Sequence, residues 1–427
     1  MKHRFALGFL IAAATLGAET HTLTLREAVA RALEQNPEVV MARLAERKAE
    51  QQVRIAHDPY IPKLYAGSGL AYTHGFPMTL EGSAPSLFEA RAQSVVFNRP
   101  IRNQLAQVKE EARGAALAAE GKRDEIAMRA VELYLEAGRA AKALGAVRAQ
   151  VAGLERVAEV LSARAAEGRE LPVTVKRAEL DVARARQRVQ LLEGDLTYAE
   201  SSLASVLGYA PGDRVRAAEE ERSPAMLPAS EEAALERAVE DNAELRRLRS
   251  AVTAQGFAVK AENSARLPRV NLVAKYGVFS RFNNYEEYFN RFQRHNGVLG
   301  VSFELPIYAG RAHQARAAQA EIEIRRLEAE LAAKQSQLTL EARRSWQEVR
   351  EAETAVEIAR LDLEVAREET GVVLALMEEG RASLREAEAA RYAENEKWLS
   401  FHEAHHGLEL ARYRLLFRTG DLLAALR

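Results

Sequence analysis

The chain contains two copies of one sequence pattern, and this duplication limits its possible folds more than any other feature. Residues 31–38 read RALEQNPE and residues 237–244 read RAVEDNAE, with five of eight positions identical at an offset of 206. Further landmarks align at that offset or, later in the chain, at 212: Pro62 with Pro268, Phe97 with Phe303, Pro100 with Pro306, Gly168 with Gly380, and Gly208 with Gly420. Two repeats are fewer than a solenoid usually needs, so the pattern predicts a duplicated fold with internal pseudo-symmetry.

Each repeat is predicted to begin with a helix. The first is expected over about residues 25–58 and its copy over about 230–264, with Thr24 and Ser230 as N-caps. Only the first has a glutamate, Glu27, at the third helical position to complete a capping box. Proline lacks the amide hydrogen and clashes with the preceding turn. The prolines expected to end these helices are Pro59, Pro62 and Pro268.

Two strands are predicted to follow the opening helix in each repeat. In the second repeat, apolar residues alternate with small or polar ones, which is the period of a strand with two unlike faces. The apolar face consists of Val270, Leu272, Ala274, Tyr276 and Val278, then Leu299, Val301, Phe303 and Leu305. The weaker counterpart in the first repeat is Leu64, Ala66, Leu70 and Tyr72, then Val95 and Phe97. Loops of about residues 74–86 and 283–296 join the strands.

A long helix and a shorter return helix are predicted to complete each repeat. The long helices are expected after Pro100 and Pro306, and they end at Gly168 and Gly380. Apolar residues alternately three and four positions apart form a coiled-coil seam along each of them. The seam positions are Leu144, Val147, Val151, Leu154, Ala158 and Leu161, then Ala352, Val356, Ala359, Leu363, Ala366, Thr370, Val373 and Met377.

Four such strands cannot close a barrel in a membrane. An apolar outer face and a small or polar inner face are typical of a membrane barrel strand, but such barrels begin at eight strands. Open sheet edges are not tolerated in lipid, because their backbone groups would remain unpaired. A dimer would supply eight strands and a trimer twelve, and the strand count alone does not choose between them. The competing interpretation is a small soluble sheet at the end of a coiled coil.

Composition and the N-terminus narrow the function classes. The 60 basic and 61 acidic residues give a net charge of -1, which argues against nucleic-acid binding. The absence of cysteine excludes disulfides, thiolate metal sites and a lipidated N-terminal cysteine. Residues 1–18 combine a basic start with an apolar run too short to span a bilayer, which predicts a cleaved signal peptide. The expected division is a signal peptide at 1–18, repeats at 19–212 and 230–427, and a linker at 213–229.

Together, these features resemble the TolC family of outer-membrane efflux proteins over essentially the whole mature chain. The resemblance implies a mainly α fold of duplicated coiled-coil hairpins with four strands per chain. It also implies a homotrimer with a 12-stranded β-barrel in outer-membrane lipid and a trimeric α-barrel across the periplasm. The implied function is the exit duct of a tripartite efflux or type I secretion system, which meets a periplasmic adaptor and an inner-membrane pump. The alternatives are a periplasmic adaptor, which would have one hairpin and several β-rich modules, and a structural coiled coil.

The resemblance further implies two sites beside the glycine turns. The residues matching the family's adaptor-docking tips are Glu167, Gly168, Arg169, Glu170 and Leu171, then Glu379, Gly380, Arg381, Ala382, Ser383 and Leu384. Glu386 matches an acidic ring that narrows the family's periplasmic entrance, with Arg381 and Arg385 as its nearest basic residues. Ala389 stands at the second acidic ring position and Ala382 at a basic gating position, so the gate departs from the family pattern there.

One motif points to a different chemistry. His402, Glu403 and His406 fit the H-E-x-x-H pattern of zinc proteases, in which two histidines one helical turn apart bind the metal. The extended form of the motif is not present, and Glu409 is too close in sequence to be the usual distant third ligand. The prediction is therefore a polar helix surface, no enzyme activity and no cofactor, although incidental metal binding by His402, His405 and His406 stays open.

Overall fold

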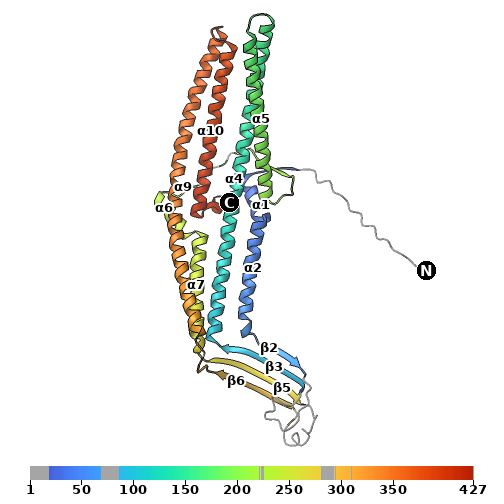
Figure 1. The fold of residues 1–427 in the computed structure, drawn as a ribbon, viewed down its shortest axis with the longest axis vertical. Coiled ribbons are helices and arrows are strands. Elements are labelled where there is room, and N and C mark those ends of the chain that lie inside the picture. The colour runs from blue at the N-terminus through green and yellow to red at the C-terminus, as the bar shows by residue number, and fades with distance from the viewer. Residues whose placement is uncertain are drawn as a thin grey trace, which may run out of the picture. The chain divides into compact units, whose positions relative to one another are not determined.

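Two compact units make up the chain (Figure 1). The computed structural model describes residues 19–68, 86–220, 222, 226–279, 293, 295–308 and 310–426. The first unit comprises Met1–Met41, Gly121–Asn242 and Leu338–Arg427, and the second comprises Ala42–Glu120 and Ala243–Gln337. Each unit therefore draws on both sequence repeats. Among the described residues, no helix has both the length and the apolarity needed to cross a bilayer.

Each repeat uses the same order of helices. In the first repeat these are α1 (Leu25–Gln35), α2 (Pro37–His57), α4 (Arg99–Ala166) and α5 (Pro172–Val206). In the second they are α6 (Glu231–Glu240), α7 (Ala243–Asn263), α9 (Ala312–Glu378) and α10 (Leu384–Thr419), followed by α11 (Leu422–Ala425). Short 3-10 turns, η1 (Asp58–Tyr60) and η2 (Ser264–Arg266), follow α2 and α7. The prediction of two long hairpins in one duplicated order is confirmed.

The opening helix of each repeat is broken, which corrects the prediction of one continuous helix over 25–58 and over 230–264. Asn36 takes an extended conformation between α1 and α2, as expected for a residue that precedes proline. Its buried side chain donates to the Val206 carbonyl at 2.8 Å and accepts from the Glu38 amide at 2.8 Å. The second break lies at Asp241, the C-cap of α6. The N-caps are as predicted, because Thr24 forms a capping box with Glu27 and Ser230 accepts from the Ala233 amide.

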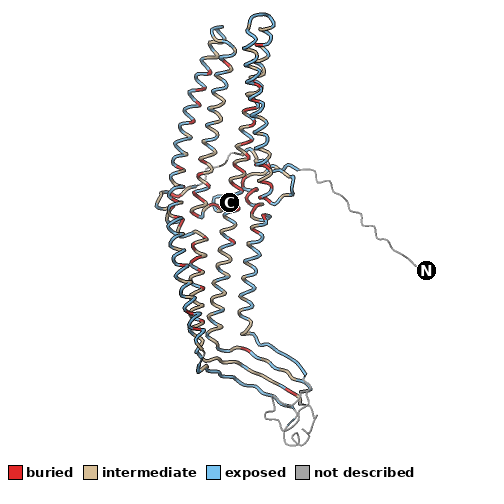
Figure 2. Tube along the Cα trace, in the orientation of Figure 1, coloured by how far each residue is buried: buried red, intermediate tan, exposed pale blue. Residues whose placement is uncertain are grey.

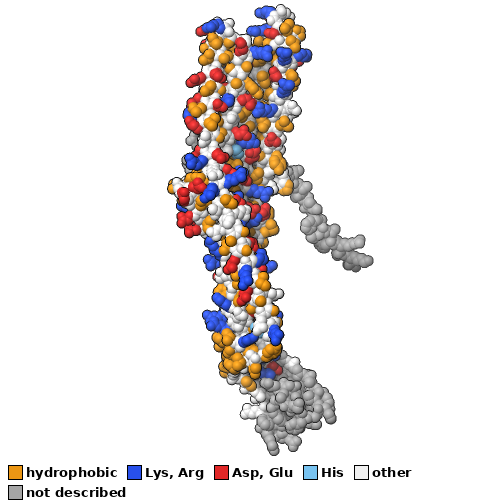
Figure 3. Space-filling view, turned by 60° about the vertical axis from the view of Figure 1, so that its left-hand side comes forward, with side chains coloured by type: hydrophobic (Ala, Val, Ile, Leu, Met, Phe, Trp, Pro, Cys, Tyr) orange, Lys and Arg blue, Asp and Glu red, His pale blue; other side chains and the backbone are white. Residues whose placement is uncertain are grey.

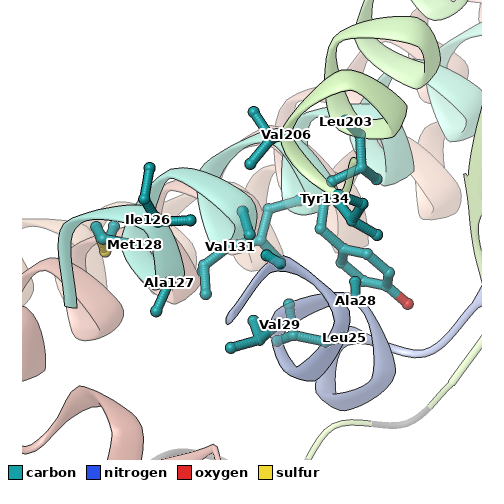
Figure 4. Close-up of a cluster of buried hydrophobic side chains, with 14 of the residues drawn as sticks. Leu25, Ala28, Val29, Ile126, Ala127, Met128, Val131, Tyr134, Leu203 and Val206 are labelled. Carbon is teal, nitrogen blue, oxygen red and sulfur yellow. The ribbon is translucent and has the colours of Figure 1, made fainter. Parts of the chain in front are cut away.

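The main core of the first unit lies where α1 crosses the hairpin of α4 and α5 (Figure 4). Leu25, Ala28 and Val29 of α1 pack against α4 residues that include Val131 and Tyr134. A second core forms around α6, where Ala234 packs with Val349, Leu408 and Leu415. Figure 2 shows the buried positions concentrated in this part of the first unit.

Several residues at equivalent positions of the two repeats have the same burial, backbone conformation or contacts. Leu203 in the first core and Leu415 in the second are both fully buried and stand 212 positions apart. Gly208 and Gly420, also 212 apart, both have positive φ, at 74° and 80°. Gly208 packs against Gln35, and Gly420 packs against Asp241, the residue 206 positions after Gln35. The pseudo-symmetry predicted from sequence therefore extends to individual contacts.

The coiled-coil seam of the second hairpin is confirmed position by position. All eight predicted residues are buried or half-buried, and Ala359, Leu363, Ala366 and Thr370 are buried. The first hairpin follows the pattern less closely, since Leu144, Val147 and Leu161 are buried, whereas Val151, Leu154 and Ala158 are half-buried. Lys397 pairs with Asp362 at 2.7 Å and so joins α10 to α9 outside the seam.

The four strands form where the sequence predicts them, except that β6 ends at Glu304 and so excludes Leu305. Their order unites the two repeats in one sheet of the second unit. The strands are β2 (Lys63–Gly67), β3 (Ser86–Phe97), β5 (Arg269–Phe279) and β6 (His295–Glu304), and they pair in the order β2-β3-β5-β6. All three pairings are antiparallel. The first repeat meets the second between β3 and β5, which leaves β2 and β6 at the two edges. Leu70, Tyr72 and most of the two predicted loops lie outside the described residues.

The register gives the sheet two unlike faces. Leu272 lies opposite Val301, and Ala274 lies opposite Leu299, so the predicted apolar residues of β5 and β6 share one face. The prediction that Val95 and Phe97 share a face is wrong. The register with β5 shifts between them, so Val95 lies opposite Asn271 and Phe97 lies opposite Val270. A bulge inserts one residue and therefore turns the following side chain to the other face.

A two-stranded parallel pair in the first unit has no counterpart in the sequence prediction. It consists of β1 (Thr20–Leu23) and β4 (Arg214–Ala217), so β4 lies within the segment expected to be a linker. The side chain of Val215 is fully buried and belongs to the main core. The start of the described chain is thereby tied to the segment that joins the two repeats.

Candidate functional site

Both hairpins turn with the same backbone geometry. The amide of Gly168 donates to the Ala165 carbonyl at 3.0 Å, and the amide of Arg169 donates to the Arg164 carbonyl at 2.8 Å. At the other tip, Gly380 donates to Met377 at 3.0 Å and Arg381 to Leu376 at 2.8 Å. Each is a Schellman motif, which places the residue after the helix in the left-handed region where glycine is favoured. The φ angles of the two glycines are 72° and 73°.

The two tips differ in how their return helices begin. At the first tip, Leu171 precedes α5 without a side-chain cap, and Pro172 occupies the first turn, where a missing donor costs little. At the second tip, the Ser383 hydroxyl accepts from the Glu386 amide, while Glu386 accepts from the Ser383 amide at 2.7 Å and from its hydroxyl at 2.8 Å. These hydrogen bonds hold the pKa of Glu386 below its usual value. Glu386 is thus a charged carboxylate fixed at the start of α10.

Of the two basic residues of the candidate gate, Arg381 lies at the second tip and Arg385 lies in a groove next to it. Arg381 pairs with Glu379 at 3.2 Å, within the tip. Arg385 instead lines a groove of about 490 Å³ between α10 and the hairpin of α4 and α5. Ala389, the departure from the acidic ring pattern, lines the same groove. A smaller cavity of about 150 Å³ nearer the tips brings Arg385 and Ser383 together with Glu170 of the first tip.

Two contacts that sequence reasoning missed join the hairpins beside this groove. The side chain of Glu388 is only 12% exposed and pairs with Arg391 at 3.0 Å. One of its oxygens would lie 3.0 Å from a Cβ placed on Gly153 of α4, so the two helices meet closely there. Arg188 of α5 pairs with Glu396 of α10 at 2.8 Å. The contact between Glu388 and Gly153 and the Arg188–Glu396 pair have no sequence signal, because in each case the partners come from different repeats.

The segment between the two repeats contacts both hairpins through Glu220 and Arg222. Arg222 binds both carboxylate oxygens of Glu409 on α10. The Tyr134 hydroxyl on α4 donates to Glu220 at 3.0 Å, and Glu220 also accepts from the Leu25 amide at 3.0 Å. Burial is the main reason that the pKa of Tyr134 is raised. On the face shown in Figure 3, acidic and basic side chains are interspersed along the hairpins and do not gather into a large patch of one sign.

The residues of the zinc-protease motif face different neighbours. The His402 ring lies 4.0 Å from the Trp398 ring, whereas His406 lies 3.8 Å from the Glu136 carboxylate on α4. Burial is the main cause of the lowered pKa of both histidines. Glu409, which was considered as a third ligand, instead accepts hydrogen bonds from Arg222. Within the described ranges, no group of three or more histidine, aspartate or glutamate side chains is arranged to hold a metal ion.

The whole-chain comparisons agree with this architecture. A family model described as outer membrane efflux protein matches residues 28–209 and 234–416, one match in each repeat. A crystal structure of CusC has a TM-score of 0.75 at 14% identity and covers 95% of both chains. The Campylobacter jejuni CmeC outer membrane channel has a TM-score of 0.74 at 13% identity, covering 93% of this chain and 86% of its own. The Vibrio cholerae outer membrane protein VceC has a TM-score of 0.71 at 17% identity, covering 93% and 96%. No curated protein sequence matches the chain.

Two long hairpins and a shared four-stranded sheet, matched by the family model over most of the chain, define an outer-membrane channel. The chain belongs to the outer membrane efflux protein family. It is an outer-membrane efflux channel with a periplasmic extension, and the adaptor and structural coiled-coil alternatives are not supported. The family is one of transport proteins, whose members are trimers that work with adaptors and inner-membrane pumps.

Proposed function

We propose that three copies of this chain close a 12-stranded barrel in outer-membrane lipid and that their hairpins form the periplasmic duct. The open sheet is the observation that carries this proposal. It has one apolar face, and its β2 and β6 edges have no partner strand among the described residues. In lipid these edges must be paired, so β6 of one copy would join β2 of the next. A trimer of four-stranded sheets meets this requirement with the strand number of the family.

The assembly can be tested in detergent. Protein extracted from the outer membrane is expected to migrate as a heat-modifiable oligomer and to give a native mass of three chains. The same measurement would report whether residues 1–18 are missing from each chain, as a cleaved signal peptide requires. A stable folded monomer recovered from membranes would contradict the barrel, because its strand edges would have to remain unpaired in lipid.

We further propose that the two glycine tips bind a periplasmic adaptor, which couples the duct to an inner-membrane pump. The tip residues support this because they repeat the same Schellman geometry and carry exposed side chains, including Leu171. The system can be of the tripartite efflux or the type I secretion kind, since this chain would contribute the same exit duct to either. No enzymatic activity is part of the proposal.

The gate is proposed to consist of Glu386, Arg385 and Arg381, each repeated three times around the periplasmic entrance. We expect the pore to be cation-selective and of low conductance in planar bilayers, because a ring of carboxylates at a narrow entrance attracts cations. Glu386→Ala is expected to weaken cation selectivity and to reduce block by multivalent cations. Arg385→Ala is expected to raise conductance, since Arg385 lines the groove where the hairpins meet.

The matched control for the gate is Ser383→Ala. It removes the hydroxyl that caps α10 but keeps the Glu386 charge, so selectivity should be unchanged even if the helix start is weakened. Unchanged selectivity in Glu386→Ala would instead place the constriction elsewhere. Glu386 would then serve only as the capping residue of α10.

A further inference from the structure

The polar face of the sheet carries two basic side chains directly opposite each other. Arg91 of β3 faces Lys275 of β5, and the row continues to Tyr65 of β2 and Val298 of β6. The row crosses all four strands near the middle of β3 and β5. Like charges on directly opposed strand positions destabilise a sheet unless other groups compensate for them.

Among the described residues, a neighbouring carboxylate compensates Lys275 but not Arg91. Lys275 lies 3.8 Å from the Glu89 carboxylate, one diagonal away. The Arg91 guanidinium lies over the Tyr65 ring, 5.3 Å from its centroid, and is exposed. Among the residues that the structure describes, no carboxylate comes within ion-pair distance of Arg91. In each chain the Arg91 guanidinium therefore has a cation–π contact with the Tyr65 ring, but no carboxylate among the described residues neutralises its charge.

The side chains on the other face of the sheet indicate whether this row would face lipid or the lumen of a barrel. That face carries apolar and small side chains, namely Leu64, Ala66, Ala90, Ala92, Leu272, Ala274, Tyr276, Leu299, Val301 and Phe303. In a membrane barrel the apolar face meets lipid and the alternate side chains face the lumen. Arg91, Lys275 and Tyr65 would therefore line the pore, and three copies would form a continuous ring.

We propose that this ring is an anion-binding station within the barrel, formed in each chain by Arg91 and Lys275 beside Tyr65. It would take solutes that carry carboxylate or phosphate groups, because a planar guanidinium binds these groups through two parallel hydrogen bonds. The low-dielectric barrel wall strengthens the field of the ring and raises the local concentration of anions. The inference rests on the proposed trimeric barrel, but it concerns a charge opposite to that of the periplasmic gate.

The test uses purified full-length oligomer in planar bilayers under a potassium chloride gradient, with inositol hexakisphosphate as the probe anion. Arg91→Gln is expected to shift the reversal potential toward greater cation selectivity and to raise the block constant about tenfold, as expected for losing one charge-assisted hydrogen bond. Arg91→Glu should shift the potential further in the same direction. Arg91→Lys should keep the wild-type reversal potential but still weaken the block, because lysine retains the charge and loses the two-pronged geometry.

Lys63→Gln is the matched control for charge loss on the same face. Lys63 is already paired with Asp58 at 2.5 Å, so its removal should leave the probe block nearly unchanged. If wild-type oligomer forms pores but Arg91→Gln and Arg91→Glu leave both reversal potential and block unaltered, the anion station is excluded while the channel function stands. If purified wild-type protein forms no pores or no oligomer, the proposed trimeric barrel itself fails.

Discussion

Replacing Gly380 with tryptophan is expected to abolish export while leaving the trimer in the outer membrane. A Cβ added to Gly380 meets nothing within 4 Å, so the indole would project from the tip without displacing the hairpin. The positive φ of 73° would cost about 1–2 kcal/mol for any L-residue, which is small beside the packing of two long helices. The loss would therefore arise from covering the surface proposed to meet the adaptor.

This effect can be measured in cells that carry the variant as their only copy of the protein. Growth should fall to that of the deletion strain in compounds to which the deletion strain is hypersensitive, and outer-membrane fractions should still contain the heat-modifiable oligomer. Gly168→Trp should act in the same way, since its φ is 72° and its surroundings are equally open. Gly380→Ala carries the same backbone strain without the bulk and should retain export. Export that survives both tryptophan variants would show that the tips are not the docking site.

Among glycine-to-alanine substitutions at the four helix-ending glycines, Gly168, Gly208, Gly380 and Gly420, Gly208→Ala is expected to cause the largest loss of stability. A Cβ on Gly208 would lie 2.8 Å from the Gln35 carbonyl oxygen and 3.0 Å from its Cβ, so the backbone of α1 would have to shift. The φ of 74° adds left-handed strain of about 1–2 kcal/mol. Overpacking at such a site typically adds about 1–3 kcal/mol.

Gly420→Ala is the matched comparison from the other repeat. It has the same kind of backbone conformation, with φ at 80°, but its Cβ would lie 3.4 Å from the nearest atom, Asp241 Cβ. Thermal unfolding of the detergent-solubilised protein, followed by helical circular dichroism, should show a larger loss of stability for Gly208→Ala than for Gly420→Ala. Equal losses would mean that backbone strain, and not the contact with Gln35, sets the cost.

Most of the fold could be predicted because two signals were long and periodic. The seam from Ala352 to Met377 keeps its spacing over many turns, and the alternation in β5 and β6 specifies which residues share a face. The break at Asn36 was also readable, since the following Pro37 disfavours a helical conformation at Asn36. The equivalent break in the second repeat, at Asp241 and Asn242, is followed by Ala243 in place of a proline, so only the alignment of the repeats could have indicated it.

The rest depended on contacts between distant segments. The four-residue strands β1 and β4 are too short to show a periodicity, and their partners are far apart in the chain. The order β2-β3-β5-β6 joins the repeats through a pairing that neither hairpin predicts alone. At the candidate site, Ser383 and Glu386 have the spacing of a capping box, which could have been read from sequence. The role of Arg385 in a groove between hairpins could not, because the groove is formed by both repeats.

In the described parts of the chain, the outer edges of β2 and β6 have no partner strand, and this affects the chain between its secretion and its assembly. Exposed strand edges with apolar side chains are templates for wrong pairing with other chains. A single chain can form all three pairings of the order β2-β3-β5-β6 by itself, but pairing of the outer edges of β2 and β6 requires encounters with other copies. Productive maturation should therefore become slower as newly secreted chains become scarcer, while aggregation competes when they accumulate. The interval before lipid insertion would be the stage at which this channel most needs a chaperone that shields strands.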